Sequence, residues 1–329
     1  MKKIIYTTTI FATLLTGCNF LDDNPQGIMT EKEAISKADE LVTTAYSSLG
    51  NDHYDVPFSL WIYGNVRADD AYKGGQDVSD IQHFHFYEIA QNIDPTFGEA
   101  DRFWFMCYMA ISRTNTALKA LQQASDAEVA NRQSRMGEMY FLRGHFYFVL
   151  KTIFGHIPFV DENTPDSAYE TTPNTLPNDE QWQKIVADFK KAYDLLPNTQ
   201  PQKGRADKYA AAAYLAKAYL YKAYRQSENN SVTGINSQDL QEVLTYTSFA
   251  LGSSYGLEDD FAFNFLPGGY ENGKESMFAV QYSVDDGTQY GRLNWGDQLS
   301  APQKLGCCDF HKPSQNLVNA FKTTNGLPD

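Results

Sequence analysis

Apolar residues recur with a helical period through most of the chain. In six stretches they return every three or four residues, which places them on one face of an α-helix. Start and stop signals support the pattern: Thr30 and Glu33 form a capping box, and Gly155 with Pro158 follows the third stretch. The predicted helices span residues 30–49, 103–121, 127–154, 180–196, 208–224 and 238–251.

The predicted helix over residues 208–224 combines alanines with five tyrosines. Alanine lets a neighbouring helix approach closely, and tyrosine fills the gaps beside it. Helix pairs with such small-residue contacts build tetratricopeptide arrays, in which each pair buries its face on the next. Loops such as 225–237 interrupt the period. The pattern therefore predicts a mostly α fold, a degenerate tetratricopeptide-like scaffold with little β structure.

The ends of the chain are less regular than this array. From Asp259 onward glycine and aromatic residues become more frequent, and one strand is predicted at Ser276–Ser283, where Phe278, Val280 and Tyr282 alternate with other residues. We expect a single domain over residues 18–329. Its parts would be an N-terminal helix with loops at residues 18–101, the helical array at residues 102–252, and a loop and strand region at residues 253–329.

Charge and aromatic content narrow the choice of ligand. The net charge is −14, which argues against nucleic acid and against electrostatic binding to anionic lipid. Aromatic residues make up 14% of the chain, with 21 Tyr and 21 Phe. Part of this excess builds core, but abundant tyrosine also suits surfaces that recognise sugars or proteins.

The N-terminus has the parts of a lipoprotein signal peptide. Lys2 and Lys3 precede a short apolar stretch, and Leu15-Thr16-Gly17-Cys18 resembles a bacterial lipobox. We expect residues 1–17 to be removed, which leaves a net charge of −16, and Cys18 to carry the acyl chains that hold the protein on a membrane. The alternative is a secreted protein with a cysteine near its cleavage site by chance.

The other cysteines and the histidines do not form a recognisable metal site. Cys107 is predicted to be a small buried residue, and the adjacent Cys307 and Cys308 are predicted to be structural, with a vicinal disulfide as one alternative. His83 and His85 would share a face on a strand, but no third ligand is evident. Acidic pairs such as 259–260 lack calcium-loop spacing. We expect no metal and no cofactor, and leave a structural calcium open.

Eight short phrases, in order, carry a family resemblance. They are Phe20–Pro25, Ala68–Asp70, Tyr108–Asn115, Arg143–Phe159, Asp188–Pro197, Gly204–Arg205, Glu275–Val280 and Pro313–Pro328. Together they resemble the SusD/RagB family of outer-membrane nutrient-binding lipoproteins. Asn325 stands where this family usually has Asp. Family members usually continue beyond the last phrase, so we expect that the family's C-terminal part is absent here.

The resemblance implies a fold, a location and a partner. The expected fold is a helical, tetratricopeptide-like scaffold with a loop-rich ligand face. Acidic Asp22 and Asp23, close to Cys18, resemble the export signal of surface lipoproteins in Bacteroidetes, which favours the outer face of the outer membrane. The family captures a glycan or other nutrient and passes it to a TonB-dependent transporter resembling SusC. The sequence does not indicate which glycan.

Aromatic side chains beside polar groups in loops are the candidate glycan contacts. Flat aromatic faces cover sugar rings, and amides, carboxylates or guanidinium groups bond hydroxyls. For each aromatic residue the alternative is core packing, which we expect for Trp104 and Trp182 because of their helical spacing. In order of preference, the candidates are the cluster of Trp295, Tyr290, Arg292, Asn294 and Asp297, then Tyr72 and Trp61, then Tyr270.

Two other classes of function compete with nutrient capture. A surface glycoside hydrolase would need two carboxylates facing each other across a sugar. The sequence has no Gly-x-Ser-x-Gly, no His-Glu-x-x-His and no phosphate loop. A peptide-binding helical scaffold is the second alternative. We expect a binding protein with no catalytic residues.

Overall fold

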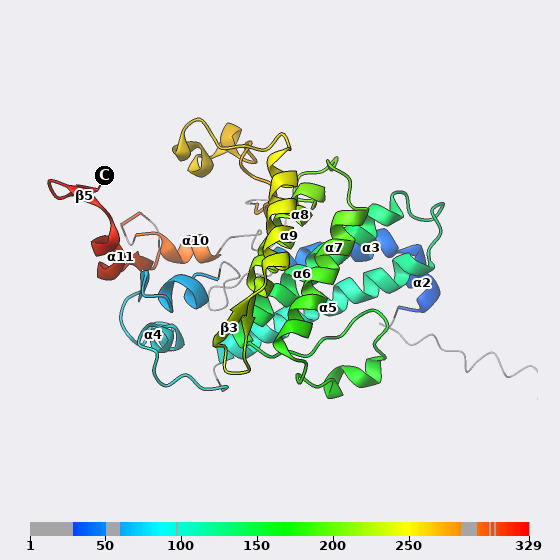
Figure 1. The fold of residues 1–329 in the computed structure, drawn as a ribbon, viewed down its shortest axis with the longest axis horizontal. Helices are drawn as coiled ribbons and strands as arrows, with labels where there is room; N and C mark the ends of the chain where they lie inside the picture. Colours follow the sequence, from blue (N-terminus) through cyan, green and yellow to red (C-terminus); the bar gives the residue numbers. More distant parts are fainter. Residues whose placement is uncertain are drawn as a thin grey trace, which may run out of the picture.

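The computed structural model describes residues 29–50, 60–96, 98–283, 295–302, 304–305 and 307–328. Seven helices of the described chain form the body of the molecule (Figure 1). They are α2 (Glu31–Ser36), α3 (Ala38–Ser47), α5 (Gly98–Gln123), α6 (Arg132–Phe154), α7 (Asn178–Leu195), α8 (Lys208–Ala223) and α9 (Ser237–Leu251). Among the described residues, no helix is both long and apolar enough to cross a membrane.

Helices that follow one another in sequence also lie side by side. α5 packs on α6, α6 on α7, α7 on α8 and α8 on α9, and α3 lies along α5 (Figure 1). The predicted mostly α, tetratricopeptide-like scaffold is confirmed.

Local backbone signals explain where the helices differ from prediction. The capping box at Thr30 and Glu33 is present, but the predicted first helix breaks at Lys37 into α2 and α3. The third predicted helix begins later, at Arg132, because Asn131 before it has a left-handed backbone with φ of 60°. A separate turn at Ser125–Glu128 precedes it, closed by hydrogen bonds between those two residues.

Glycine allows α6 and α7 to approach closely. A Cβ atom built on Gly144 would lie 3.0 Å from Cε1 of Phe189, and one on Gly137 would lie 3.0 Å from Cγ of Leu196. The alanines of α8 also form packing surface, since all of them except Ala213 are buried. The predicted small-residue contacts are therefore a feature of this array.

A buried polar network joins α5, α6, α7 and the segment after α6. Arg143 on α6 donates a bidentate pair of hydrogen bonds to Asp188 on α7, at 2.8 and 2.7 Å. Its third nitrogen reaches Asn115 Oδ1 at 2.8 Å and Glu162 Oε2 at 2.5 Å. Burial is the largest single effect and raises the pKa of Glu162, but the charge and hydrogen bond of Arg143, together with further hydrogen bonds such as that from Tyr140, leave the pKa lowered. Three of the family-like phrases thus meet at one guanidinium group.

A second, smaller core lies beside the array. β1 (Ala71–Gly74) pairs antiparallel with β4 (Phe310–Pro313), and Trp61, Phe84 and Phe310 are buried next to them. The surrounding elements lie on the left of Figure 1. They are η3 (Ile62–Val66), α4 (Gln82–Glu88), α10 (Trp295–Ser300) and α11 (Gln315–Ala320).

The remaining elements are short. β2 (Tyr224–Gln226) and β3 (Val232–Ile235) form a hairpin between α8 and α9 within a predicted loop. The others are η2 (Ser48–Gly50), η4 (Asp166–Thr171), η5 (Phe261–Phe265), η6 (Gly268–Tyr270), β5 (Thr323–Thr324) and β6 (Leu327–Pro328). The division of residues 18–329 as a single domain stays a prediction.

One local prediction was wrong. Ser276–Tyr282 is an irregular segment rather than a strand, and Phe278 and Val280 within it pack against the helical core; only Ser283 is a bridge residue. His83 and His85 lie on helix α4, so the strand geometry in which they would share a face does not apply. His83 contacts Glu99 instead, and no cluster of metal-ligating side chains occurs among the described residues.

Three of the four cysteines lie among the described residues. Cys107 is buried in the main core, where burial raises the pKa of its thiol, as expected for a structural cysteine. Cys307 and Cys308 form a vicinal disulfide in the structure, which was one of the two alternatives.

Candidate ligand-binding pocket

Most of the first predicted glycan cluster lies outside the described residues. This holds for Tyr290, Arg292 and Asn294, as it does for Cys18. Trp295 and Asp297 are placed only by the backbone of α10, which begins at Trp295. Their role in glycan binding stays a prediction.

The other predicted contacts have different settings. Tyr72 on β1 is 45% exposed, and its hydroxyl accepts a hydrogen bond from the backbone N–H of Gln315 at 3.2 Å. Tyr270 is 44% exposed, with its ring 4.7 Å from that of Phe263. Trp61 is 4% exposed and is stacked on His311, so its setting favours the packing alternative.

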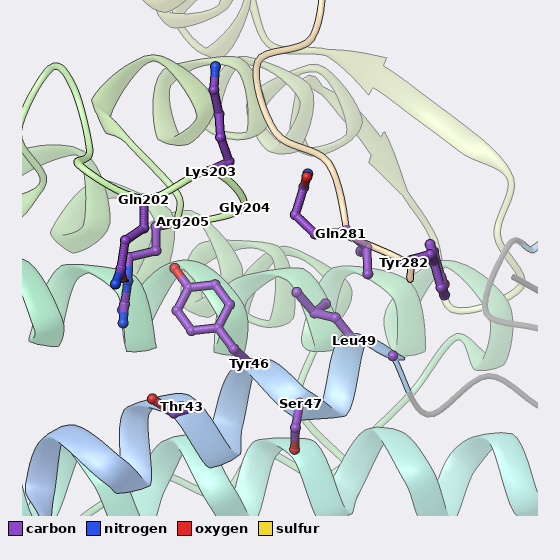
Figure 2. Close-up of a pocket in the computed structure, with 12 residues that line it drawn as sticks. Thr43, Tyr46, Ser47, Leu49, Gln202, Lys203, Gly204, Arg205, Gln281 and Tyr282 are labelled. Carbon is purple, nitrogen blue, oxygen red and sulfur yellow. Dashed lines mark hydrogen bonds between the residues drawn. The ribbon is translucent and has the colours of Figure 1, made fainter. Parts of the chain in front are cut away.

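The structure shows a pocket that these predictions did not include. A cavity of about 470 Å³ lies between α3, the loop at residues 202–205 and the segment at residues 280–282 (Figure 2). Tyr46, Leu49 and Val280 supply apolar surface, and polar side chains surround it (Figure 2). The volume lies within the range typical of small-molecule sites.

Glycine is required where the loop passes the opposite wall. Gly204 has a backbone φ of +80°, which favours glycine, and a Cβ there would lie 2.8 Å from Cγ of Gln281. The base of the loop is closed by hydrogen bonds from Lys208 N to Pro197 O at 2.9 Å and from Gln200 Nε2 to Ala206 O at 2.8 Å. The wall of the pocket is therefore a defined turn.

A buried carboxylate fixes this wall to the helices beneath it. Glu138 on α6 is fully buried and accepts hydrogen bonds from Arg205 at 2.7 Å and from Arg135 at 2.9 Å. The Arg205 guanidinium lies 5.6 Å from the centre of the Tyr46 ring, whose hydroxyl accepts a bond from Ala206 N at 3.0 Å. Burial, followed by the charge of Glu138, raises the pKa of Tyr46 well above its usual value. The ring and the guanidinium group are thus held before any ligand arrives.

The pocket combines aromatic surface with uncharged hydrogen-bonding groups. Gln202 and Gln281 present amides, Thr43 and Ser47 present hydroxyls, and Arg205 is paired with the buried Glu138. Lys203 also lines the pocket, with its side chain extending away from Tyr46 (Figure 2). None of the described lining residues carries a carboxylate. This set of groups suits a neutral, polyhydroxylated ligand with an apolar face.

Sequence reasoning missed the pocket because its walls are far apart in the chain. Tyr46 belongs to the first predicted helix and Gln281 to the predicted strand, and nothing in either pattern brings them together. One signal was present: Gly204-Arg205 was a separate phrase of the family resemblance, and it belongs to the loop that forms the third wall of the pocket.

Comparison with known proteins identifies the family. Residues 19–220 match the model of the SusD-like family, described as "Starch-binding associating with outer membrane". The chain belongs to this SusD-like family. A curated SusD-like relative, SusD-like protein P2 of Formosa agariphila, is 26% identical over 221 residues, which cover 65% of this chain and 42% of P2.

Solved SusD-like structures share the fold. Surface glycan-binding protein A from Bacteroides fluxus matches with a TM-score of 0.67 at 20% identity, over 87% of this chain and 61% of that one. The same protein from Bacteroides thetaiotaomicron, solved in complex with laminarihexaose, matches with a TM-score of 0.65 at 19% identity, over 88% of this chain and 61% of that one. The chain thus spans less than two thirds of the length of each.

Proposed function

We propose that this protein is a cell-surface, lipid-anchored glycan-binding protein of the outer membrane. It would capture an oligosaccharide and deliver it to a TonB-dependent, SusC-like transporter. The observation that carries the proposal is the family match over residues 19–220, since that family is described as starch-binding and associated with the outer membrane. A similar fold solved with laminarihexaose adds support.

The pocket beside α3 is our proposed site of glycan capture. Tyr46 and Leu49 offer apolar surface to a sugar face, and Gln202 and Gln281 offer amides to its hydroxyls. We also propose a further glycan contact in the chain after the segment at residues 280–282. It consists of Tyr290, Arg292, Asn294, Trp295 and Asp297.

Binding without catalysis is the better-supported mode. A glycosidase needs two carboxylates on opposite sides of the scissile bond. The described residues that line the pocket include none. Recovery of the intact oligosaccharide after long incubation is the expected result, and release of shorter sugars by the purified protein would favour the hydrolase alternative.

A blocking substitution tests the pocket. Thr43 lies on the exposed side of α3 at the pocket edge, and its hydroxyl bonds only its own helix, to Asp39 O at 3.3 Å. In Thr43→Trp the indole should fill the pocket and lower affinity for laminari- or malto-oligosaccharides about tenfold or more, measured by isothermal titration calorimetry.

The matched control is Thr116→Trp, since Thr116 is an exposed threonine on α5 that bonds Ser112 O in the same way. It should bind these sugars as the wild type does. Unchanged binding by a folded Thr43→Trp protein would place the site elsewhere.

Co-purification of the membrane-anchored protein with a TonB-dependent transporter tests the delivery step. If no transporter co-purifies, the delivery part of the proposal is wrong and only glycan capture stands.

A further inference from the structure

A second cavity adjoins the proposed capture pocket. It measures about 450 Å³ and lies between the same loop, residues 199–207, and the segment at residues 272–279. Gln202–Arg205 line both cavities, and the opposite walls, 272–279 and 280–282, are one continuous run of chain. The two cavities are therefore neighbours along a single pair of walls.

The second cavity is lined mainly by uncharged polar groups. Thr199, Gln200, Asn272 and Ser276 contribute hydroxyls and amides, and Phe278 contributes an aromatic surface. These are again groups that bond sugar hydroxyls and cover sugar faces.

Four charged residues line this cavity, and two of them, Lys274 and Arg205, are paired with a carboxylate. Lys274 pairs with Asp259 at 2.7 Å, and Arg205 pairs with Glu138 at 2.7 Å. Asp207 accepts a hydrogen bond from Tyr255 at 2.8 Å and one from Ala210 N at 2.8 Å. The other two lining charges, Lys203 and Asp207, have opposite signs, and in Figure 2 the Lys203 side chain extends away from Tyr46 in the neighbouring pocket. This balance favours a neutral ligand over an anionic one.

The loop and the opposite wall touch where the two cavities meet. Gln281 stands opposite Gly204 (Figure 2), where even a methyl group on the loop would meet its side chain at 2.8 Å. Its amide forms a reciprocal pair with the amide of Asn272, at 3.0 and 2.9 Å. Both bonds are exposed, and each can be replaced by a bond of equal type to a sugar hydroxyl.

We propose that the two cavities are consecutive subsites for one linear, neutral glycan. The chain of sugars would pass over the contact between Gly204 and Gln281 on its exposed side, and the Asn272–Gln281 amides would exchange their mutual bonds for bonds to hydroxyls at this crossing. The inference rests on the proposed function, and it adds that affinity depends on ligand length because a short sugar fills only the pocket beside α3.

Laminari- and malto-oligosaccharides of two to six units serve as probes, with affinity measured by calorimetry. In the wild-type protein affinity should rise with length. Ser276→Trp, which fills the second cavity, should lower affinity for the six-unit sugar about tenfold and leave that for the two-unit sugar unchanged. Thr43→Trp should weaken both, and Ser112→Trp, on the exposed face of α5, should weaken neither.

A second variant covers the case in which Ser276→Trp does not fold. Asn272 has a left-handed backbone with φ of 54°, which glycine tolerates, so Asn272→Gly removes the amide at the crossing without adding bulk or strain. It should also lower affinity for the long sugar alone. Equal affinity at all lengths, or folded Ser276→Trp and Asn272→Gly proteins that bind six units normally, would overturn this inference and leave the proposed function standing. Failure of the wild-type protein to bind any length of either series would overturn both.

Discussion

The tryptophans of the chain have contrasting settings. Trp182 on α7 is 5% exposed and packs against Phe148, and Trp61 is buried in the second core. Trp295 opens α10, directly after a polar, glycine-containing stretch. A buried indole and an indole that stacks on a sugar respond to truncation in opposite ways, so the same substitution separates the two roles.

We expect Trp295→Ala to weaken glycan binding without lowering the melting temperature. Covering one indole face with a sugar ring removes roughly 50–80 Å² of apolar surface from water, worth on the order of 1–2 kcal/mol. Affinity measured by calorimetry should therefore fall about tenfold. The buried Trp182→Ala is the control, and it should cost roughly 3–5 kcal/mol of stability. If Trp295→Ala instead melts early and binds normally, Trp295 is a packing residue.

Sequence alone separated these residues only in part. The helical spacing of Trp182 predicted its burial correctly, because its partners on α6 and α8 belong to neighbouring helices. Trp61 was a candidate contact, and nothing local revealed that His311 and Phe310 would cover it from the far end of the chain. Sequence patterns are local, so they do not predict the burial of a residue that is covered by segments far away in the chain.

At the scale of elements, the array depends on polar as well as apolar contacts. Arg143 ties α6 to Asp188 on α7 and to Glu162 in the segment that follows α6. All three side chains are almost fully buried, so each charge relies on the others for compensation. The helix pattern predicted which helices exist and their order, whereas this network and the irregular path of Ser276–Tyr282 depend on tertiary contacts that carry no periodic signal.

Arg143→Leu should destabilise the protein by about 3–5 kcal/mol, because it leaves two buried carboxylates without their counter-ion. Lys190→Leu is the control. It breaks the exposed pair between Lys190 and Asp194 on α7 and should cost at most about 1 kcal/mol. Urea unfolding followed by circular dichroism measures both. Equal losses for the two variants would mean that the buried network contributes no more than a surface pair.

At the scale of the whole molecule, we propose that the acidic helical protein is attached to the membrane only by a lipid at its N-terminus. With a net charge of −14, electrostatic attraction to anionic lipid would not replace a lost anchor. Attachment should then depend on a single residue.

Cys18→Ala should abolish membrane attachment in cells. Metabolic labelling with a fatty acid, followed by fractionation, should show label and membrane association for the wild type and neither for the variant. Cys107→Ala, a change in the buried core, is the control and should keep the label. Label retained by Cys18→Ala would rule out this cysteine as the lipid site.

The pairing of β1 with β4 has a consequence for how the molecule assembles. Ser314 bonds the carbonyl of Asp69, 245 residues away in sequence, whereas the array is built from neighbouring helices. Contacts that close such long loops form slowly, so helix pairs should condense first and the small core last. Trp61 and Phe84 therefore stay uncovered until Phe310 packs against them. During this interval residues 60–88 expose apolar side chains that a chaperone can bind.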